Sequence, residues 1–217
     1  ITLRAIRILL TTPVIACEDT RRTGQLIKIL SEKETPYKES PFSFEKRLLS
    51  RKFISVRDWN EAKLVNVIVN RLQEGDVALV SDAGTPLISD PGFKIVRAAL
   101  QSGFTVSPIP GPSAAIAALS VSGLPTDKFV FLGFLPKKWE LYPGITNIIY
   151  ESPKRAKKTL ELIKAKYPEA KIVVAHELTK IHELITNNYE LITDSPKGEW
   201  IILVNFSPSS PTPAESP

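Results

Sequence analysis

Short apolar runs alternate with longer amphipathic segments along most of the 217-residue chain. Runs of four to eight apolar residues are typical of buried strands, whereas the longer segments repeat their apolar residues at helical spacing. This alternation predicts crossover units around a largely parallel sheet, and therefore an α/β fold. We expect strands over 14–17, 53–56, 77–81, 105–109, 129–133, 147–151, 171–175 and 199–205.

Helical segments are expected between these strands. Their ranges are 20–30, 61–73, 91–101, 112–121 and 153–166. The last three begin at Pro91, Pro112 and Pro153. Proline is tolerated in the first helical turn because an N–H group there would have no partner within the helix. The prolines therefore predict where these three helices start.

The chain is expected to form two domains. A turn-rich stretch over 122–126 joins a helix of small residues to an aromatic strand, which is typical of a hinge. We therefore expect an N-terminal α/β domain over 1–124 and a C-terminal α/β domain over 125–206. Residues 207–217 hold four prolines and four serines and predict a flexible tail. The chain has no methionine and begins inside an apolar periodic segment, so we expect it to lack its start, including the first strand of the N-terminal domain.

The amino-acid composition excludes several classes of protein. The chain has 43% apolar and 24% charged residues, which excludes a disordered or collagen-like protein. Its 28 basic residues against 23 acidic ones favour an anionic partner. One cysteine and two histidines offer neither a disulfide nor a metal-ligand spacing, so the sequence predicts no metal site. No signal segment or long apolar run is found, which favours a cytoplasmic protein.

Two loops of small residues are the strongest candidates for a ligand site. The first, over 81–92, follows an expected buried strand, and the second, over 108–115, follows the next one. In open α/β sheets, ligands bind beyond the carboxyl ends of strands. Gly84 permits close backbone approach, and Asp82 can accept hydrogen bonds from an amine or a ribose hydroxyl. Each loop by itself is also explained by a tight turn with helix caps.

A third cluster, A-C-E-D-T-R-R-T over 16–23, follows the strand over 14–17. Its two acids, Glu18 and Asp19, are explained by the positive end of the helix that follows. Adjacent Arg21 and Arg22 are typical of phosphate contacts. In the second half, Lys154 and Arg155 open a segment over 154–171 that holds seven basic residues against two acidic ones. This basic segment can be a solvated helix face or an RNA contact.

Taken together, the motifs resemble one known family. They are A-C-E-D-T-R-R-T-G, N-E at 60–61, V-A-L-V-S-D-A-G-T-P-L-I-S-D-P-G, P-G-P-S-A, G-L-P-T-D-K-F-V-F-L-G-F-L-P, Y-E-S-P-K-R, E-L-T-K and G-E at 198–199. The chain resembles the tetrapyrrole (corrin/porphyrin) methylase superfamily. Within it, the chain is most similar to the bacterial family of 16S ribosomal RNA cytidine 2'-O-methyltransferases. The resemblance runs from residue 1 to about residue 204.

The resemblance implies a fold, a cofactor and a substrate. The fold has an N-terminal domain with a mostly parallel sheet and a C-terminal domain with a mixed sheet, with a cofactor cleft between them. The cofactor is S-adenosylmethionine, the substrate is 16S rRNA in the small ribosomal subunit, and a homodimer is usual. The implied cofactor-binding residues are Ser81, Asp82, Ala83, Gly84, Thr85, Leu87, Ile88, Pro112, Ser113, Ala114, Tyr150, Ser152 and Ala175. We expect Arg21, Arg22, Lys154 and Arg155 at the cleft rim, in contact with RNA.

Methyl transfer to a ribose hydroxyl requires alignment of methyl and oxygen and a group that manages the hydroxyl proton. The candidates are Lys180, Glu177 and Glu151. Lys180 comes first, because an ammonium can stabilise a developing oxyanion, or act as a base if its pKa is depressed. Lys180 can equally be a structural partner of Glu177 or Glu183. Two alternative functions remain at this stage, a methyltransferase for a corrin or porphyrin precursor and a non-catalytic RNA-binding module.

Overall fold

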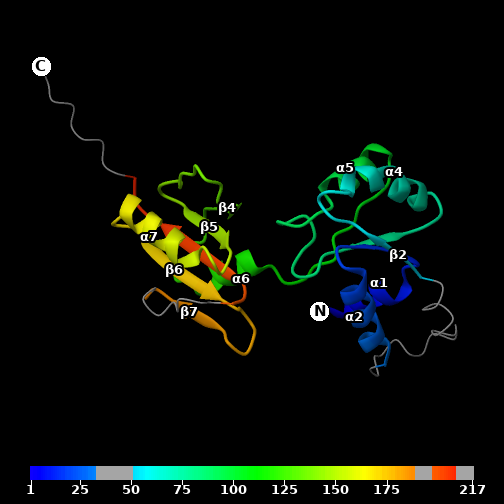
Figure 1. Cartoon of the computed structure of the whole chain (residues 1–217), viewed down its shortest axis with the longest axis horizontal. Helices are drawn as coiled ribbons and strands as arrows, with labels where there is room; N and C mark the ends of the chain where they lie inside the picture. The colour runs from blue at the N-terminus through cyan, green and yellow to red at the C-terminus, as the bar shows by residue number, and fades with distance from the viewer. Residues whose placement is uncertain (33–50, 189–196, 209–217) are drawn as a thin grey trace, which may run out of the picture. The chain divides into compact units, whose positions relative to one another are not determined.

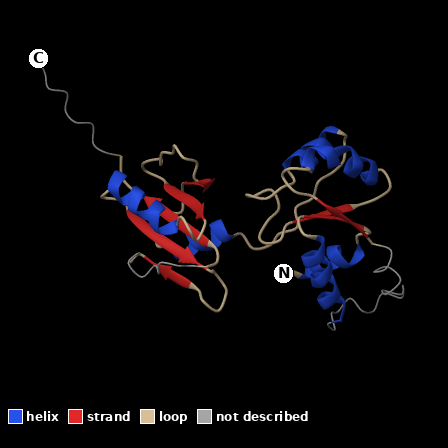
Figure 2. Cartoon of the chain, in the orientation of Figure 1, coloured by secondary structure: helices blue, strands red, loops and turns tan. Residues whose placement is uncertain are grey.

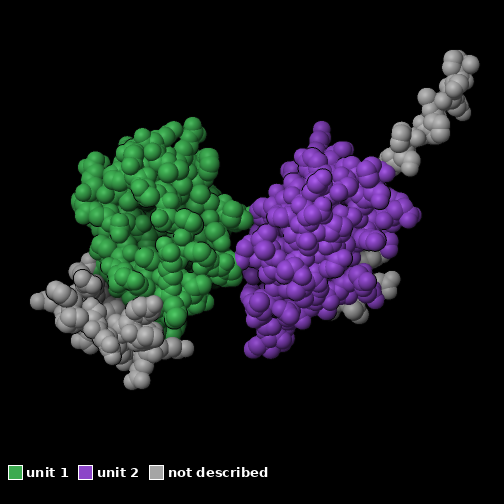
Figure 3. Space-filling model, turned by 180° about the vertical axis from the view of Figure 1, so that it is seen from behind, with its two compact units in different colours: residues 1–112 green, residues 113–217 purple. Residues whose placement is uncertain are grey.

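The computed structural model describes residues 1–32, 51–188 and 197–208. The chain forms two compact units, residues 1–112 and residues 113–217, called unit 1 and unit 2 here (Figure 3). The division falls before the helix over 114–121 rather than near residue 125. The physical reason is that Ala115, Ala118 and Leu119 of this helix pack into the core of unit 2.

Unit 1 is built on a parallel sheet. Its elements are α1 (Leu3–Thr11), β1 (Val14–Cys17), α2 (Thr20–Glu32), β2 (Lys52–Ser55), α4 (Glu61–Leu72), β3 (Val77–Val80) and α5 (Phe93–Gln101). The strand order is β2-β1-β3, and both neighbours of β1 are parallel to it (Figure 1). This agrees with the mostly parallel sheet expected for the N-terminal part.

Helices cover both faces of this sheet (Figure 2). Ile15 and Cys17 of β1 face a core made with α1 and α2. Ala16 lies between them in sequence and faces the opposite core, where Ile68 of α4 and Ile95 of α5 pack. The alternation of neighbouring residues between two apolar cores explains why β1 is apolar at every position.

Unit 2 contains a mixed sheet, as expected. Its elements are α6 (Ala114–Val121), β4 (Phe129–Phe134), β5 (Thr146–Glu151), α7 (Ala156–Lys166), β6 (Lys171–His176), β7 (Leu184–Thr186) and β8 (Trp200–Asn205). The order is β4-β5-β8-β6-β7, with β4 parallel to β5 and the remaining pairs antiparallel. Strand β8 is central, and Trp200, Ile202 and Val204 face α7, whereas Ile201 and Leu203 face α6.

Several expected elements differ in the structure. Residues 105–109 form no strand, because Pro108 and Pro110 lack backbone donors and Val106 is 42% exposed. The three helix-opening prolines lie before the helices, since α5, α6 and α7 have Gly92, Ser113 and Arg155 as N-cap residues. Helix α1 and strand β7 were not predicted. The tail over 207–217 lies outside the described residues from 209 onward.

Two further observations concern the cysteine of unit 1 and the length of the helices. Cys17 is fully buried in the core of unit 1, and burial raises the pKa of its thiol. It is therefore a protonated core residue. Within the described ranges, no helix combines the length and the apolar character that a membrane crossing requires.

Glu61 ties two helices of unit 1 together beneath the 81–92 loop. Its side chain is 5% exposed, and one carboxylate oxygen accepts hydrogen bonds from the backbone N–H groups of Gly92 (3.1 Å) and Lys94 (2.7 Å). These donors belong to the start of α5, where helical N–H groups have no partner within the helix. The carboxylate at the start of α4 thus caps α5 and fixes the far end of the loop.

Replacing Glu61 with alanine is expected to destabilise unit 1 by about 1–3 kcal/mol, because the buried N–H of Gly92 would lose its partner. Urea unfolding can be followed through the reactivity of Cys17 with a thiol reagent, since the only cysteine of the chain reports unit 1 alone. The matched control is Glu74→Ala, whose exposed carboxylate pairs only with Arg71 in the described structure. Equal stability losses in the two variants would contradict the capping role.

Candidate functional site

The parallel sheet of unit 1 brings three chain segments to one edge. Because β1, β2 and β3 run in the same direction, the residues that follow them meet beyond their carboxyl ends. Ser55 at the end of β2 donates from its hydroxyl to the carbonyl of Glu18 (3.2 Å). The backbone N–H of Asp19 donates to a carboxylate oxygen of Asp82 (3.2 Å). The motifs over 16–23 and 81–92, which are far apart in sequence, therefore lie together.

Asp19 is the cap of α2. Its carboxylate accepts from the backbone N–H groups of Arg21 (2.8 Å) and Arg22 (3.3 Å). These hydrogen bonds lower the pKa of Asp19, and nearby guanidinium groups of Arg21 and Arg57 act in the same direction. This is the capping explanation that the sequence already offered for the acids of this motif.

The two adjacent arginines differ in their surroundings. Arg22 forms an ion pair with Asp82 at 3.2 Å while its side chain stays 73% exposed. Arg21 is exposed beside Asp19. Both guanidinium groups can therefore reach an anion in solvent, but for Arg22 that contact competes with the carboxylate of Asp82.

The 81–92 loop has an unusual backbone. Leu87 and Ser89 have φ values of 73° and 66°, which side-chain-bearing residues rarely adopt, and Gly84 has a φ of 69°. A Cβ at Gly84 would meet no atom within 4 Å, so its backbone is open to approach. At Gly92 the φ of 131° would strain any residue with a side chain, and a Cβ there would lie 2.7 Å from Cδ2 of Leu79. Strain of this kind concentrates at functional sites and is retained only where the surroundings impose it.

Acidic groups dominate the electrostatics of this loop. Desolvation raises the pKa of Asp90, a hydrogen bond with the Ser81 side chain opposes the rise, and the negative charges of Glu18, Asp82 and Asp58 add to it. The Ser81 hydroxyl also donates to the carbonyl of Ala83 (2.9 Å). The loop therefore suits a ligand that carries positive charge or hydroxyl donors.

The second predicted loop contacts the first. The hydroxyl of Thr85 donates to the carbonyl of Pro112 (3.4 Å), and Thr2 donates to the carbonyl of Pro110 (3.2 Å). Ile88 is 44% exposed, and its N–H donates to the carbonyl of Thr85 (3.3 Å). The structure thus brings Thr85 and Pro112 together although the strand expected before the second loop is absent.

In unit 2, the start of α6 meets the end of β5. The N-cap Ser113 makes no side-chain cap hydrogen bond, and the N–H of Ala115 donates to the hydroxyl of Tyr150 (3.1 Å). The Tyr150 ring packs edge-on against Phe131, with ring centroids 4.8 Å apart. Tyr150 is therefore fixed by contacts from two elements. Ala114 is partly buried beside this core, whereas Ala175 of β6 is 1% exposed within it.

Glu151 lies in the interior of unit 2 and is fully engaged. One carboxylate oxygen accepts from the N–H of Ser152 (2.7 Å), and the other accepts from the hydroxyl of Thr159 (2.7 Å). Arg155 pairs with the same carboxylate at 3.1 Å and donates to the carbonyl of Leu135 (2.8 Å). These contacts anchor the start of α7. Arg155, a predicted RNA contact, is thus partly engaged by Glu151 and Leu135. Its neighbour Lys154 is exposed.

The most constrained cluster of unit 2 is the turn over 177–180, which follows β6. Glu177 and Thr179 have φ values of 47° and 64°. The carboxylate of Glu177 accepts from the N–H of Glu199 (2.8 Å) and from Nζ of Lys180 (2.9 Å), and Lys180 also reaches Glu199 (3.1 Å). A Cβ at Gly198 would collide with the Glu177 carboxylate. Gly198 has a φ of 93°, which a residue with a side chain rarely adopts, so the turn favours glycine there.

These contacts set the charge of the turn. The backbone hydrogen bond from Glu199, followed by the bond from Lys180, lowers the pKa of Glu177. The hydrogen bond to Glu177 raises the pKa of Lys180. Lys180 is consequently an ammonium and Glu177 a carboxylate at neutral pH. The structure thus brings the predicted residues Lys180 and Glu177 together. Glu199 and Gly198 also belong to this cluster, and the site prediction left them out although the G-E motif contained them.

Other residues of the site were also missed. Asn60 accepts from the N–H of Arg57 (2.7 Å) and donates to the carbonyl of Ser55 (3.0 Å), which holds the turn after β2. The N-E motif pointed to this position without giving it a role. His176 stacks on Trp200, with ring centroids 4.2 Å apart. Among the described residues no group of three potential metal ligands is found.

Comparisons with known proteins agree on the family. The family model for tetrapyrrole (corrin/porphyrin) methylases matches residues 1–190. The chain is 40% identical to "Ribosomal RNA small subunit methyltransferase I" of Vibrio cholerae, over 94% of the chain and 72% of that protein. It is 43% identical to the protein of the same name in a Hydrogenobaculum species, over 84% of the chain and 76% of that protein.

Solved structures show the same fold at low sequence identity. A uroporphyrin-III C-methyltransferase from Thermus thermophilus aligns with a TM-score of 0.59 and 17% identity, over 94% of this chain and 87% of that one. A structure described as uroporphyrin-III C-methyltransferase from the same organism complexed with S-adenyl homocysteine aligns with a TM-score of 0.53 and 18% identity, over 94% and 90%. These findings confirm the family to which the motifs pointed: the chain belongs to the tetrapyrrole (corrin/porphyrin) methylases.

Proposed function

We propose that the protein transfers a methyl group from S-adenosylmethionine to 16S ribosomal RNA of the small subunit, at the 2'-hydroxyl of a cytidine. The observation that carries this proposal is the identity of about two residues in five, over most of the chain, with proteins named as small-subunit rRNA methyltransferases. The ribose position and the cytidine rest on the motif resemblance, which includes the S-D-A-G-T-P run.

The residues of unit 1 fit the proposed cofactor chemically. S-adenosylmethionine has a cationic sulfonium, an amine and ribose hydroxyls, and the 81–92 loop presents acidic groups and an open glycine backbone. Asp82 and the backbone of Gly84 would hold the cofactor, with Ser81, Ala83, Thr85, Leu87 and Ile88 lining it. When bound, the cofactor supplies an electrophilic methyl group for attack by an oxygen nucleophile.

Residues over 112–114 and in unit 2 complete the proposed cofactor set. The side chain of the N-cap Ser113 makes no cap hydrogen bond, although the hydroxyl of Tyr150 accepts from the N–H of Ala115. N–H groups at a helix start attract a carboxylate. Pro112, Ala114, Tyr150, Ser152 and Ala175 are retained as proposed neighbours. Because Ala175 is buried within the sheet, it can act only by shaping the core beneath the site.

The 177–180 turn supports one of the roles considered for Lys180. Its raised pKa makes it a poor proton acceptor, and the lowered pKa of Glu177 makes that carboxylate a weak base. We therefore propose that Lys180 stabilises negative charge that develops on the ribose oxygen, while the hydroxyl proton passes to water and the cofactor leaves as a neutral thioether. Glu177 positions the ammonium. Glu151, whose oxygens are engaged by Ser152, Thr159 and Arg155, positions the start of α7.

Two alternative functions are a methyltransferase for a corrin or porphyrin precursor and a non-catalytic RNA-binding module. A corrin or porphyrin substrate is suggested by the names of the structurally similar uroporphyrin-III C-methyltransferases, but their 17–18% identity supports the fold alone. A non-catalytic RNA-binding module would bind RNA without transferring methyl groups. A homodimer and a cytoplasmic location stay predictions.

The decisive test is transfer of a radiolabelled methyl group. Purified protein and labelled S-adenosylmethionine are incubated with small ribosomal subunits that lack the modification, and the labelled nucleotide is then mapped. Label on a cytidine 2'-oxygen is the expected result. Binding of subunits without any transfer would support the non-catalytic alternative, and label on a base would overturn the ribose position.

Lys180→Ala is expected to lower the rate of methyl transfer at least about a hundredfold, as is typical for loss of an oxyanion-stabilising donor, and to leave cofactor affinity unchanged. Because the pair Glu177 and Lys180 stays ionised near neutral pH, the pH–rate profile between about pH 6 and 9 should keep its shape in the variant. A matched control is Lys171→Ala at the exposed start of β6. Wild-type activity in Lys180→Ala would remove the proposed role.

The salt concentration should affect RNA affinity strongly and cofactor affinity hardly at all. If Arg21, Arg22, Lys154 and Arg155 each neutralise one phosphate of a single strand, raising salt from about 50 to about 200 mM weakens RNA binding roughly fiftyfold. Cofactor affinity should hardly change, because a small ligand displaces few counterions. Filter binding with RNA and calorimetry with the cofactor measure the two effects. RNA affinity as insensitive to salt as cofactor affinity would contradict the predicted contacts.

A further inference from the structure

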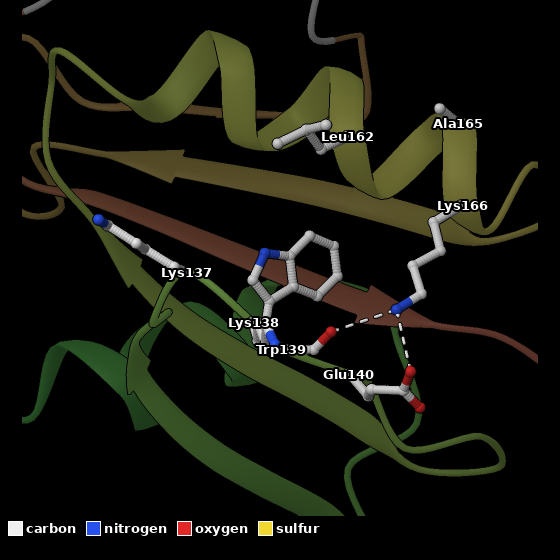
Figure 4. Close-up of a pocket in the computed structure, with 7 residues that line it drawn as sticks. All are labelled: Lys137, Lys138, Trp139, Glu140, Leu162, Ala165 and Lys166. Carbon is white, nitrogen blue, oxygen red and sulfur yellow. Dashed lines mark hydrogen bonds and ion pairs between the residues drawn. The ribbon is translucent and has the colours of Figure 1, made fainter.

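A surface pocket of unit 2 is lined by residues that the proposed methyl transfer does not use. Its volume is about 850 Å³, and its walls are the segment after β4 and the second half of α7 (Figure 4). The lining residues are Lys137, Lys138, Trp139, Glu140, Leu162, Ala165 and Lys166. The pocket thus combines an aromatic ring, aliphatic carbon atoms and three lysines.

The apolar part of the pocket is held in place before any ligand binds. The Trp139 ring packs against the core beneath α7 and lies near Tyr167, with centroids 6.5 Å apart. Nζ of Lys166 lies 5.2 Å from the centre of the Trp139 ring and donates to the carbonyl of Trp139 (3.2 Å). Leu162 is 47% exposed beside the ring. A rigid aromatic and aliphatic surface of this kind binds a flat group at little entropic cost.

The charged part of the pocket is only partly neutralised. Lys166 pairs with Glu140 at 3.2 Å, so its charge has a partner. Lys137 and Lys138 are exposed, and in the described part of the chain neither forms an ion pair or a side-chain hydrogen bond. Two ammonium groups therefore remain available to an anion at the rim of an apolar surface.

We propose that this pocket binds an unpaired nucleotide of the RNA substrate. Its base lies against Trp139 and Leu162, and its flanking phosphates lie against Lys137 and Lys138. Bases stack on aromatic side chains while cationic groups track the backbone in proteins that bind single strands. This inference rests on the proposed rRNA substrate and adds a second RNA contact to it.

The position of the pocket separates it from the reacting nucleotide. Helix α7 leads from Lys166 into the start of β6, whereas Lys180 follows the end of that strand. Six residues of extended chain from Lys171 to His176 span about 17 Å. The pocket and the Lys180 turn therefore contact different nucleotides, and the pocket contributes to recognition rather than to the chemical step.

The charge component is tested with a double variant, Lys137→Glu with Lys138→Glu. The probes are a fluorescent single-stranded oligoribonucleotide and purified small subunits. We expect the affinity for the oligoribonucleotide to fall at least about tenfold, and the slope of log affinity against log salt to fall by about 1.4, which corresponds to two phosphates of a single strand. The matched control, Lys63→Glu with Lys128→Glu, changes the net charge equally with two exposed lysines outside the pocket. Equal losses in both double variants would overturn the proposal.

The stacking component is tested with Trp139→Leu and Trp139→Phe. Leucine keeps apolar contact with the core, and phenylalanine also keeps a ring. We expect Trp139→Leu to weaken oligoribonucleotide binding by about five- to a hundredfold and Trp139→Phe to recover most of it. Thermal unfolding of both variants monitors the fold. RNA affinity in Trp139→Leu equal to that of the wild type, with the fold intact, would overturn the proposal.

Two further outcomes are informative. If the pocket variants bind subunits weakly but bind the oligoribonucleotide like the wild type, the pocket contacts a protein and the inference is wrong. At saturating subunits the pocket variants should transfer methyl groups at the wild-type rate. If the wild-type protein transfers no methyl groups, the proposed function fails. The effect of the pocket variants on RNA affinity would still test whether the pocket binds RNA.

Discussion

The parallel pairing of β1 with both β2 and β3 is the constraint on which the candidate site of unit 1 depends. Parallel strands end at the same edge, so the motifs that follow them are brought together whatever their separation in sequence. The hydrogen bond from the Asp19 backbone to Asp82 joins two residues that are 63 positions apart in the sequence. Antiparallel pairing of any of these strands would send its motif to the opposite edge. The burial of β1 in two cores is therefore what assembles the site.

In both units, glycines and residues with strained backbone conformations allow the close contacts of the candidate loops. In unit 1, Gly92 lets the loop return close to Leu79, and in unit 2, Gly198 makes room for the carboxylate of Glu177. Leu87, Ser89, Glu177 and Thr179 hold backbone conformations that cost of order 1–3 kcal/mol each. Such conformations persist only where neighbouring contacts impose them. Their location in the two loops where the motif resemblance also points makes these loops the natural place for ligand chemistry.

Sequence reasoning predicted the elements whose pattern is local and missed those that depend on distant partners. Strand β1 was predicted at its exact bounds because four apolar residues stand between polar turns. Residues 105–109 hold only two such apolar residues, Val106 and Ile109, and Pro108 and the 42% exposure of Val106 decide against a strand. Strand β7 has three residues and exists only through pairing with β6, which no local pattern reveals.

The same limit applies to the candidate site. The sequence singled out Lys180 and Glu177 because both are chemically capable residues in one short motif. It left out Glu199, which joins them across 19 residues, because proximity in space is not visible from spacing. Arg155 and Glu151 were assigned to RNA and catalysis from their place in the Y-E-S-P-K-R motif, whereas their mutual ion pair at the start of α7 emerges only from the fold.

The charge distribution suggests that the two units divide the ligands between them. Burial raises the pKa of Asp90 in the 81–92 loop, and the negative charges of Glu18, Asp82 and Asp58 add to the rise. Negative charge at this loop attracts a cationic sulfonium but repels phosphate. In unit 2, the exposed lysines of the Trp139 pocket and of α7 present the opposite charge. Arg21 and Arg22 are the exception, since they stand beside Asp19 and Asp82. Arg22 pairs with Asp82, and the charge of Arg21 acts on Asp19, so an RNA phosphate that approaches unit 1 must compete with carboxylates already in place. It follows that most of the electrostatic affinity for RNA should originate in unit 2.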